Sequence, residues 1–96
     1  MELVRAHFFI KGRVQKVGFR YFLCQEAEKY NLSGWVRNRF DGRVEGVVEG
    51  DKEAVEAFLV SCRQGPPRAW VEEVEFSYEE VQGERGFEAF ALWPIF

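Results

Sequence analysis

The segment from residue 12 to residue 20 has the composition of an anion site: Gly12-Arg13-Val14-Gln15-Lys16-Val17-Gly18-Phe19-Arg20. It lies between an alternating, strand-like segment and an amphipathic helical segment, so the backbone N–H groups at its helical end have no intrahelical acceptors. These groups lie at the positive end of the helix dipole, where phosphate binds. Arg20 adds a planar fork of donors. The segment is therefore either a phosphate cradle or a tight strand-to-helix connection with a surface arginine, and alone it does not separate the two.

Asn38 is a second polar residue that could take part in chemistry. Asparagine is disfavoured inside strands, yet this one stands in a strand-like run three residues before Asp41-Gly42. One interpretation is a polar residue on a solvated face. The other is a functional neutral amide, which can donate and accept hydrogen bonds at once.

The single histidine and the two cysteines are weaker candidates for chemistry. His7 falls on the more polar face of the first strand-like segment, where a lone histidine is typically a surface residue rather than a general base. Cys24 and Cys62 fall at or near apolar positions of the two helical segments. With His7 they supply too few ligands for a zinc site. We therefore expect reduced thiols, no metal site and a cytoplasmic protein.

Composition limits the remaining possibilities. The 96 residues are 47% hydrophobic and 17% aromatic, which predicts one folded domain spanning residues 1–96. The apolar runs are short and broken by charge, so we expect neither a membrane span nor a signal peptide. The formal charge of −3 argues against a general nucleic-acid binder, although Arg13, Lys16 and Arg20 form a local basic cluster.

Hydrophobic periodicity predicts the elements that position these residues. The expected strands cover residues 3–11, 35–40, 43–49, 70–78 and 87–92, and the expected helices run from about 19 to 31 and from the N-cap Asp51 to about 63. The Asp41-Gly42 pair predicts a hairpin between the second and third strands. In the strand at 70–78 the alternation places four aromatic or apolar residues on one face: Trp70, Val74, Phe76 and Tyr78.

This order of elements predicts an α+β fold of the ferredoxin-like, split βαβ type. Right-handed crossovers place both helices on one face of an antiparallel sheet, and an extra C-terminal strand follows. This two-layer sandwich hosts many functions, so the fold alone does not define the activity.

Two motifs resemble those of the acylphosphatase family. The first family pattern, Gly-x-Val-Gln-Gly-Val-x-Phe-Arg, corresponds to residues 12–20. The second, Gly-aromatic-Val-x-Asn-x-x-Asp/Glu-Gly-x-Val, corresponds to Gly34-Trp35-Val36-Arg37-Asn38-Arg39-Phe40-Asp41-Gly42-Arg43-Val44. The Gly65-Pro66-Pro67 loop is also similar to the family, and the resemblance covers essentially the whole chain.

The resemblance implies hydrolysis of small acyl phosphates to a carboxylate and inorganic phosphate. It implies that Arg20 and the loop amides hold the phosphoryl group and that Asn38 orients the attacking water. The phosphate-binding residues it implies are Gln15, Lys16, Val17, Gly18, Phe19 and Arg20. We expect a monomer with no cofactor and no nucleic-acid or membrane partner.

The chemistry of acyl phosphates supports these roles independently. The leaving group is a carboxylate, whose acid titrates near pH 4, so its departure needs no general acid. Positioning and charge stabilisation therefore supply most of the catalysis. Backbone amides and one guanidinium can stabilise the phosphoryl oxygens without a metal, a covalent nucleophile or a cofactor.

One residue departs from the family pattern. Lys16 stands where the family has a glycine. If that position requires a positive φ angle, a lysine there costs about 1 kcal/mol or somewhat more. We expect altered substrate affinity rather than loss of the site.

Two rival functions remain open at this point. The first is a non-catalytic phosphate- or anion-binding module on the same fold, similar to a domain of larger carbamoyl-transfer maturation proteins. The second is an RNA-binding domain of the RRM type, which shares the order of elements. That type stacks bases on aromatic residues of its sheet, whereas residues 43–49 contain two glutamates and no aromatic residue.

Overall fold

The computed structural model describes residues 2–81 and 83–95. The elements are β1 (Leu3–Arg13), α1 (Phe19–Lys29), β2 (Ser33–Asn38), β3 (Val44–Asp51), α2 (Lys52–Gln64), β4 (Trp70–Glu79) and β5 (Phe90–Leu92). Their types and order match the sequence prediction, while several boundaries differ by a few residues and β5 is much shorter than expected. Within the described ranges, neither helix is long and apolar enough to cross a membrane.

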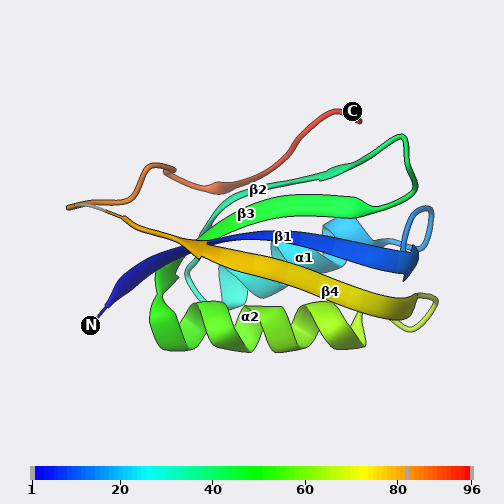
Figure 1. The fold of residues 1–96 in the computed structure, drawn as a ribbon, viewed down its shortest axis with the longest axis horizontal. Helices are drawn as coiled ribbons and strands as arrows, with labels where there is room; N and C mark the ends of the chain where they lie inside the picture. Colours follow the sequence, from blue (N-terminus) through cyan, green and yellow to red (C-terminus); the bar gives the residue numbers. More distant parts are fainter. Residues whose placement is uncertain (1, 82, 96) are drawn as a thin grey trace.

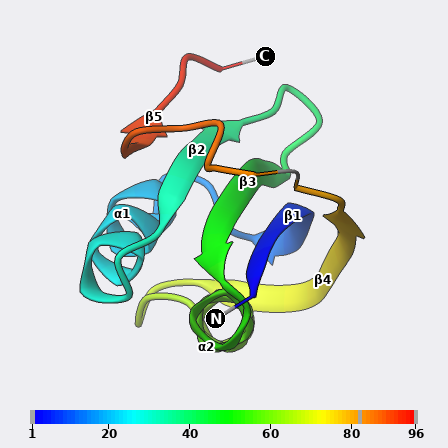
Figure 2. The same cartoon turned by 90° about the vertical axis from the view of Figure 1, so that its left-hand side faces the viewer.

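The strands form one sheet in the order β4-β1-β3-β2-β5. The first four strands pair antiparallel, as predicted, but β5 pairs parallel to β2. The reason is the path of the chain after β4, which crosses from one edge of the sheet to the opposite edge before it enters β5 (Figure 2). The five-stranded sheet is therefore mixed rather than wholly antiparallel.

Both helices cover the same face of the sheet (Figure 1). The predicted apolar stripes face inward: Phe19, Leu23 and Ala27 of α1 are buried, as are Val55, Phe58, Leu59 and Cys62 of α2. They meet the alternating inner residues of β1, and the ring of Phe8 contacts that of Phe58 edge-on with centroids 5.6 Å apart. This core holds α1 against α2, β2 and β5, and it fixes the loop that precedes α1.

Local sequence sets the ends of both helices. Asn31 adopts the left-handed conformation with φ 56°, and the N–H groups of Asn31 and Leu32 donate to the carbonyls of Glu28 and Ala27. This is a Schellman ending, and it closes the helix that the sequence predicts to end at about residue 31. Asp51 occupies the N-cap position of α2, as predicted, but its side chain makes no capping hydrogen bond.

The prediction that Trp70 shares one face of β4 with Val74, Phe76 and Tyr78 was wrong. The pairing of β1 with β4 shifts register between Lys11 and Gly12, which moves the alternation of β4 by one residue at that end. Val71 consequently packs against the core, and Trp70 is 71% exposed. Val74 packs against the core opposite Ile10.

Candidate active site

A cavity of about 170 Å³ lies where the loop of residues 14–18 and the start of α1 meet the ends of β2 and β5. It is lined by Val14, Lys16, Gly18, Phe19, Arg20, Tyr21, Asn38 and Leu92. Residues of both sequence motifs therefore line one small, partly enclosed space. A larger surface hollow elsewhere is lined mainly by acidic and basic side chains of β1, β4 and the hairpin.

The loop leaves its backbone N–H groups without acceptors. Among the described residues, no carbonyl or side chain accepts from the N–H groups of residues 15–18, and the first intrahelical bond of α1 runs from Phe22 N to Gly18 O. Gly18 adopts φ 81° as the N-cap of α1. Unpaired donors at a helix N-terminus form a region suited to an anion.

Arg20 differs from three other half-buried arginines of the chain. Arg5, Arg37 and Arg39 each lie within ion-pair distance of a carboxylate. Within the described part of the chain, no carboxylate lies that close to Arg20, although the residue is partly buried and lines the cavity. Its fork of donors is therefore available to a ligand.

Asn38 lines the same cavity and carries an unpaired acceptor among the described residues. The side chain is in register with the inward face of β2, two residues after the buried Val36. Its Oδ1 atom is buried, and no described residue donates a hydrogen bond to it. Ser33 Oγ, at the other end of β2, has the same property but does not line the cavity.

Lys16 occupies a strained backbone position. Its φ angle is 62°, in the left-handed region that favours glycine. A non-glycine residue there costs about 1–2 kcal/mol. The positive φ angle means that Lys16 carries the backbone strain expected of a non-glycine residue. The lysine also lines the cavity, and among the described residues no carboxylate pairs with its charge.

The side chain of Gln15 lies outside the cavity. Its Nε2 atom donates to the backbone carbonyls of Arg39 at 2.7 Å and of Arg43 at 3.0 Å. Only the backbone of Gln15 thus remains for an anion. The side chains of Val17 and Phe19 pack in or against the hydrophobic core.

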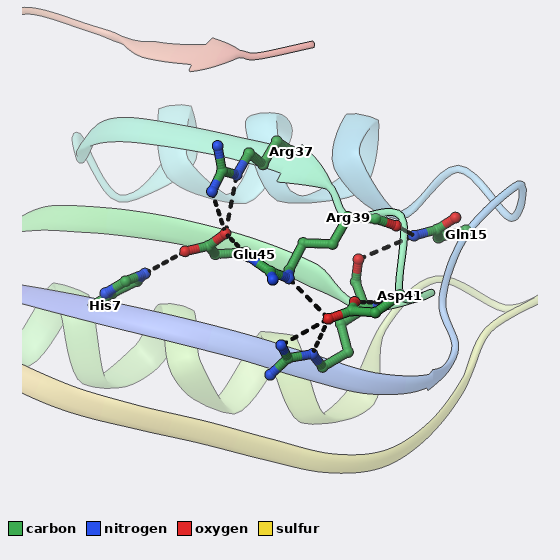
Figure 3. A network of polar contacts seen from close by, with 7 residues as sticks. His7, Gln15, Arg37, Arg39, Asp41 and Glu45 are labelled. Atoms are coloured by element: carbon green, nitrogen blue, oxygen red, sulfur yellow. Dashed lines mark hydrogen bonds and ion pairs between the residues drawn. The ribbon is translucent and has the colours of Figure 1, made fainter. Parts of the chain in front are cut away.

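A buried carboxylate on the open face of the sheet was not anticipated from the sequence. Glu45 is 4% exposed and accepts hydrogen bonds from three side chains: His7 at 2.6 Å, Arg37 at 2.9 Å and Arg39 at 3.0 Å (Figure 3). Burial pushes the pKa of Glu45 up, but the three hydrogen bonds together outweigh it and leave the pKa below its ordinary value. The alternation of β3 places Glu45 on the open face, although it does not reveal this burial.

His7 therefore has a structural partner. Its side chain is 32% exposed, contacts Glu45 and does not line the cavity. His7 thus lies apart from Arg20 and Asn38, which line the cavity. At the hairpin tip, the hydrogen bonds from Arg43 and Arg39 hold the pKa of Asp41 well below its usual range and order the loop.

Neither thiol has the environment of a catalytic nucleophile. Burial raises the pKa of Cys62, and it also raises the pKa of Cys24 despite the nearby positive charge of Arg20. Both cysteines are free. In the described ranges, no three His, Cys, Asp or Glu residues come together as metal ligands.

Comparisons with known proteins identify the family of this chain. The acylphosphatase family model matches residues 6–89. An acylphosphatase of Moorella thermoacetica is 58% identical over 87 residues, covering 91% of this chain and 94% of that protein. The crystal structure of acylphosphatase from Bacillus subtilis superposes with a TM-score of 0.87 at 37% identity, covering 94% of this chain and 98% of that chain.

The same fold also occurs within a larger protein. Full-length HypF in its phosphate- and nucleotide-bound form matches with a TM-score of 0.86 at 30% identity, over 98% of this chain but only 12% of that chain. By contrast, this chain spans nearly the whole length of the Moorella and Bacillus proteins. The chain therefore belongs to the acylphosphatase family of enzymes.

Proposed function

We propose that this enzyme hydrolyses acyl phosphates by direct attack of a water, oriented by Asn38, on a phosphoryl group held by the backbone amides of residues 15–19 and by Arg20. The observation that carries this proposal is that loop residues with unpaired N–H groups and Asn38, whose Oδ1 has no partner among the described residues, line a single cavity. Donors suit the phosphoryl oxygens, and the acceptor suits the hydrogen of a water.

The donors act on the charge that develops during phosphoryl transfer. Loop N–H groups and the positive end of α1 surround the equatorial oxygens, and Arg20 supplies two parallel donors. Because these groups are fixed by the fold before substrate binds, they stabilise the transition state without reorganising. Lys16 adds a positive charge at the rim of the cavity.

Asn38 positions the nucleophile without acting as a strong base. Its buried Oδ1 accepts a hydrogen bond from the water, which aligns the water oxygen opposite the leaving group. The P–O bond to the acyl oxygen breaks, the water oxygen forms the new P–O bond, and the carboxylate leaves unprotonated. Both hydrogens of the water remain with the inorganic phosphate. The cavity of about 170 Å³ is smaller than a typical ligand pocket, so the acyl group extends beyond it and is loosely specified.

Hydrolysis of benzoyl phosphate by wild type and Arg20→Ala, with and without EDTA, tests this function. We expect rapid hydrolysis that EDTA does not change, and loss of both phosphate binding and activity in Arg20→Ala. Arg63→Ala, which removes an exposed arginine in the last turn of α2, is the matched control and should behave as wild type.

Two outcomes would contradict the proposal. Hydrolysis that EDTA abolishes would show that a metal takes part. A folded wild-type protein that binds phosphate but does not hydrolyse benzoyl phosphate would support the alternative, a non-catalytic phosphate-binding module on the same fold.

A further inference from the structure

The side chain of Gln15 connects two parts of the chain that are distant in sequence. The two hydrogen bonds from its Nε2 atom to Arg39 O and Arg43 O span 24 and 28 residues. These two carbonyls stand on opposite sides of the hairpin, whose neck is closed by the bond from Arg39 N to Arg43 O at 2.9 Å. Figure 3 shows Gln15 reaching this neck from the loop after β1.

This connection joins the two halves of the site. Gln15 directly precedes Lys16 in the loop, and Arg39 directly follows Asn38 at the end of β2. In residues 2–81 and 83–95, no other hydrogen bond joins loop 14–18 to segment 38–43. The ladder between β1 and β3 ends earlier, at the pair of Ile10 and Val44.

The chemistry of the amide also excludes a direct role of this side chain in phosphate binding. A primary amide nitrogen carries two hydrogens, and Gln15 uses both of them on backbone carbonyls. The remaining Oε1 atom is an acceptor, which a phosphate oxygen would repel. The contribution of the side chain must therefore act through what it positions.

We propose that Gln15 is a positioning residue that fixes the phosphate cradle relative to Asn38. This inference rests on the proposed function, because the distance it sets matters only if Asn38 orients the attacking water. Displacement of catalytic groups by about 1 Å can lower a rate about 100-fold. Without the two hydrogen bonds of the partly exposed Gln15 side chain, the loop can move by part of that distance relative to Asn38.

Gln15→Met removes both donors while keeping the length of the side chain, and Gln25→Met on the exposed side of α1 is the matched control. We expect kcat for benzoyl phosphate to fall roughly tenfold in Gln15→Met, with the inhibition constant of inorganic phosphate changed less than about threefold. Gln15→Glu should be worse, because it turns carboxylate oxygens toward two carbonyls. The control should match wild type in both quantities.

A double-mutant cycle with Asn38→Ala separates positioning from a general structural effect. If Gln15 acts through Asn38, Gln15→Met should lower kcat much less in the Asn38→Ala background than in wild type. Equal losses in both backgrounds, or wild-type kcat in a folded Gln15→Met protein, would overturn the inference. If Asn38→Ala alone leaves kcat unchanged, the proposed function itself fails at that step, which is a distinct result.

Circular dichroism melting establishes that each variant is folded at the assay temperature. Should Gln15→Met not fold, Gln15→Asn is measured instead, because it retains the amide but is one methylene too short to reach both carbonyls. A reduced kcat with near-normal phosphate inhibition supports positioning. Parallel losses of kcat and phosphate affinity would show that Gln15 affects the phosphate cradle alone, and they would refute the positioning role.

Discussion

Replacing Lys16 with glycine should stabilise the fold and weaken phosphate binding at the same time. The backbone of Lys16 has φ 62°, which costs a non-glycine residue about 1–2 kcal/mol. Glycine removes that strain but loses about 0.5–1 kcal/mol through the greater freedom of its unfolded chain. The net gain is therefore about 0.5–1 kcal/mol, or roughly 2–8 °C in melting temperature for a domain of this size.

The charge of Lys16 has a separate effect on the ligand. A unit charge about 4 Å from a phosphate oxygen in water contributes about 1 kcal/mol, which is about fivefold in affinity. Lys16→Ala removes the charge but keeps a side chain at the strained position, so it separates the two effects. Both variants should bind inorganic phosphate about fivefold more weakly, and only Lys16→Gly should melt at a higher temperature.

Calorimetric melting and phosphate titration at low and high salt measure these two effects. Asn31→Gly is a useful comparison, because Asn31 has φ 56° but asparagine tolerates that region, so its gain should be smaller. If Lys16→Gly melts no higher than Lys16→Ala, the argument from backbone strain is wrong. If phosphate affinity is unchanged in both variants, Lys16 does not contribute to the anion site.

Three further predictions concern the site, the open face and the loop glycines. Asn38→Ala should lower kcat while largely sparing phosphate inhibition; a loss of phosphate affinity as severe as in Arg20→Ala would refute the water-orienting role. Because its folded-state pKa is lowered, Glu45 stabilises the protein above its ordinary pKa and loses this contribution as the pH falls through the folded value. Glu45→Gln should therefore lower the free energy of unfolding at pH 7 by roughly 2 kcal/mol, and the melting temperature with it. The difference in stability from wild type should shrink below about pH 4, and a difference independent of pH would contradict this. Gly12→Ala would place a Cβ atom 2.2 Å from Trp70 O and should cost more than about 3 kcal/mol in denaturant unfolding, whereas Gly18→Ala, with no atom within 4 Å, should cost about 1 kcal/mol; equal costs would show that steric contact is not decisive.

Local signals were sufficient for most of the fold. The helices were predictable because their apolar residues recur with the helical period. Asn31 follows the end of α1, and its left-handed backbone conformation stops the helix there. The hairpin was predictable from Asp41-Gly42, since that pair suits a tight reversal between strands and Gly42 indeed has φ 93°. Each of these features depends on neighbours within a few residues.

The candidate site was predictable in its members but not in its geometry. The motif resemblance named Arg20 and Asn38, and the structure places both around one cavity. It could not indicate that the side chain of Gln15 faces the hairpin rather than the cavity, because that contact depends on how the loop packs against residues 39–43. The cluster around Glu45 was missed for the same reason.

The sequence by itself determined the elements, their order and the residues available for chemistry, because periodicity, turn residues and motif spacing are local properties of the chain. Only the tertiary structure decided that β5 lies parallel to β2 and that the register shift exposes Trp70. These features follow from contacts between segments far apart in sequence, so no local pattern contains them.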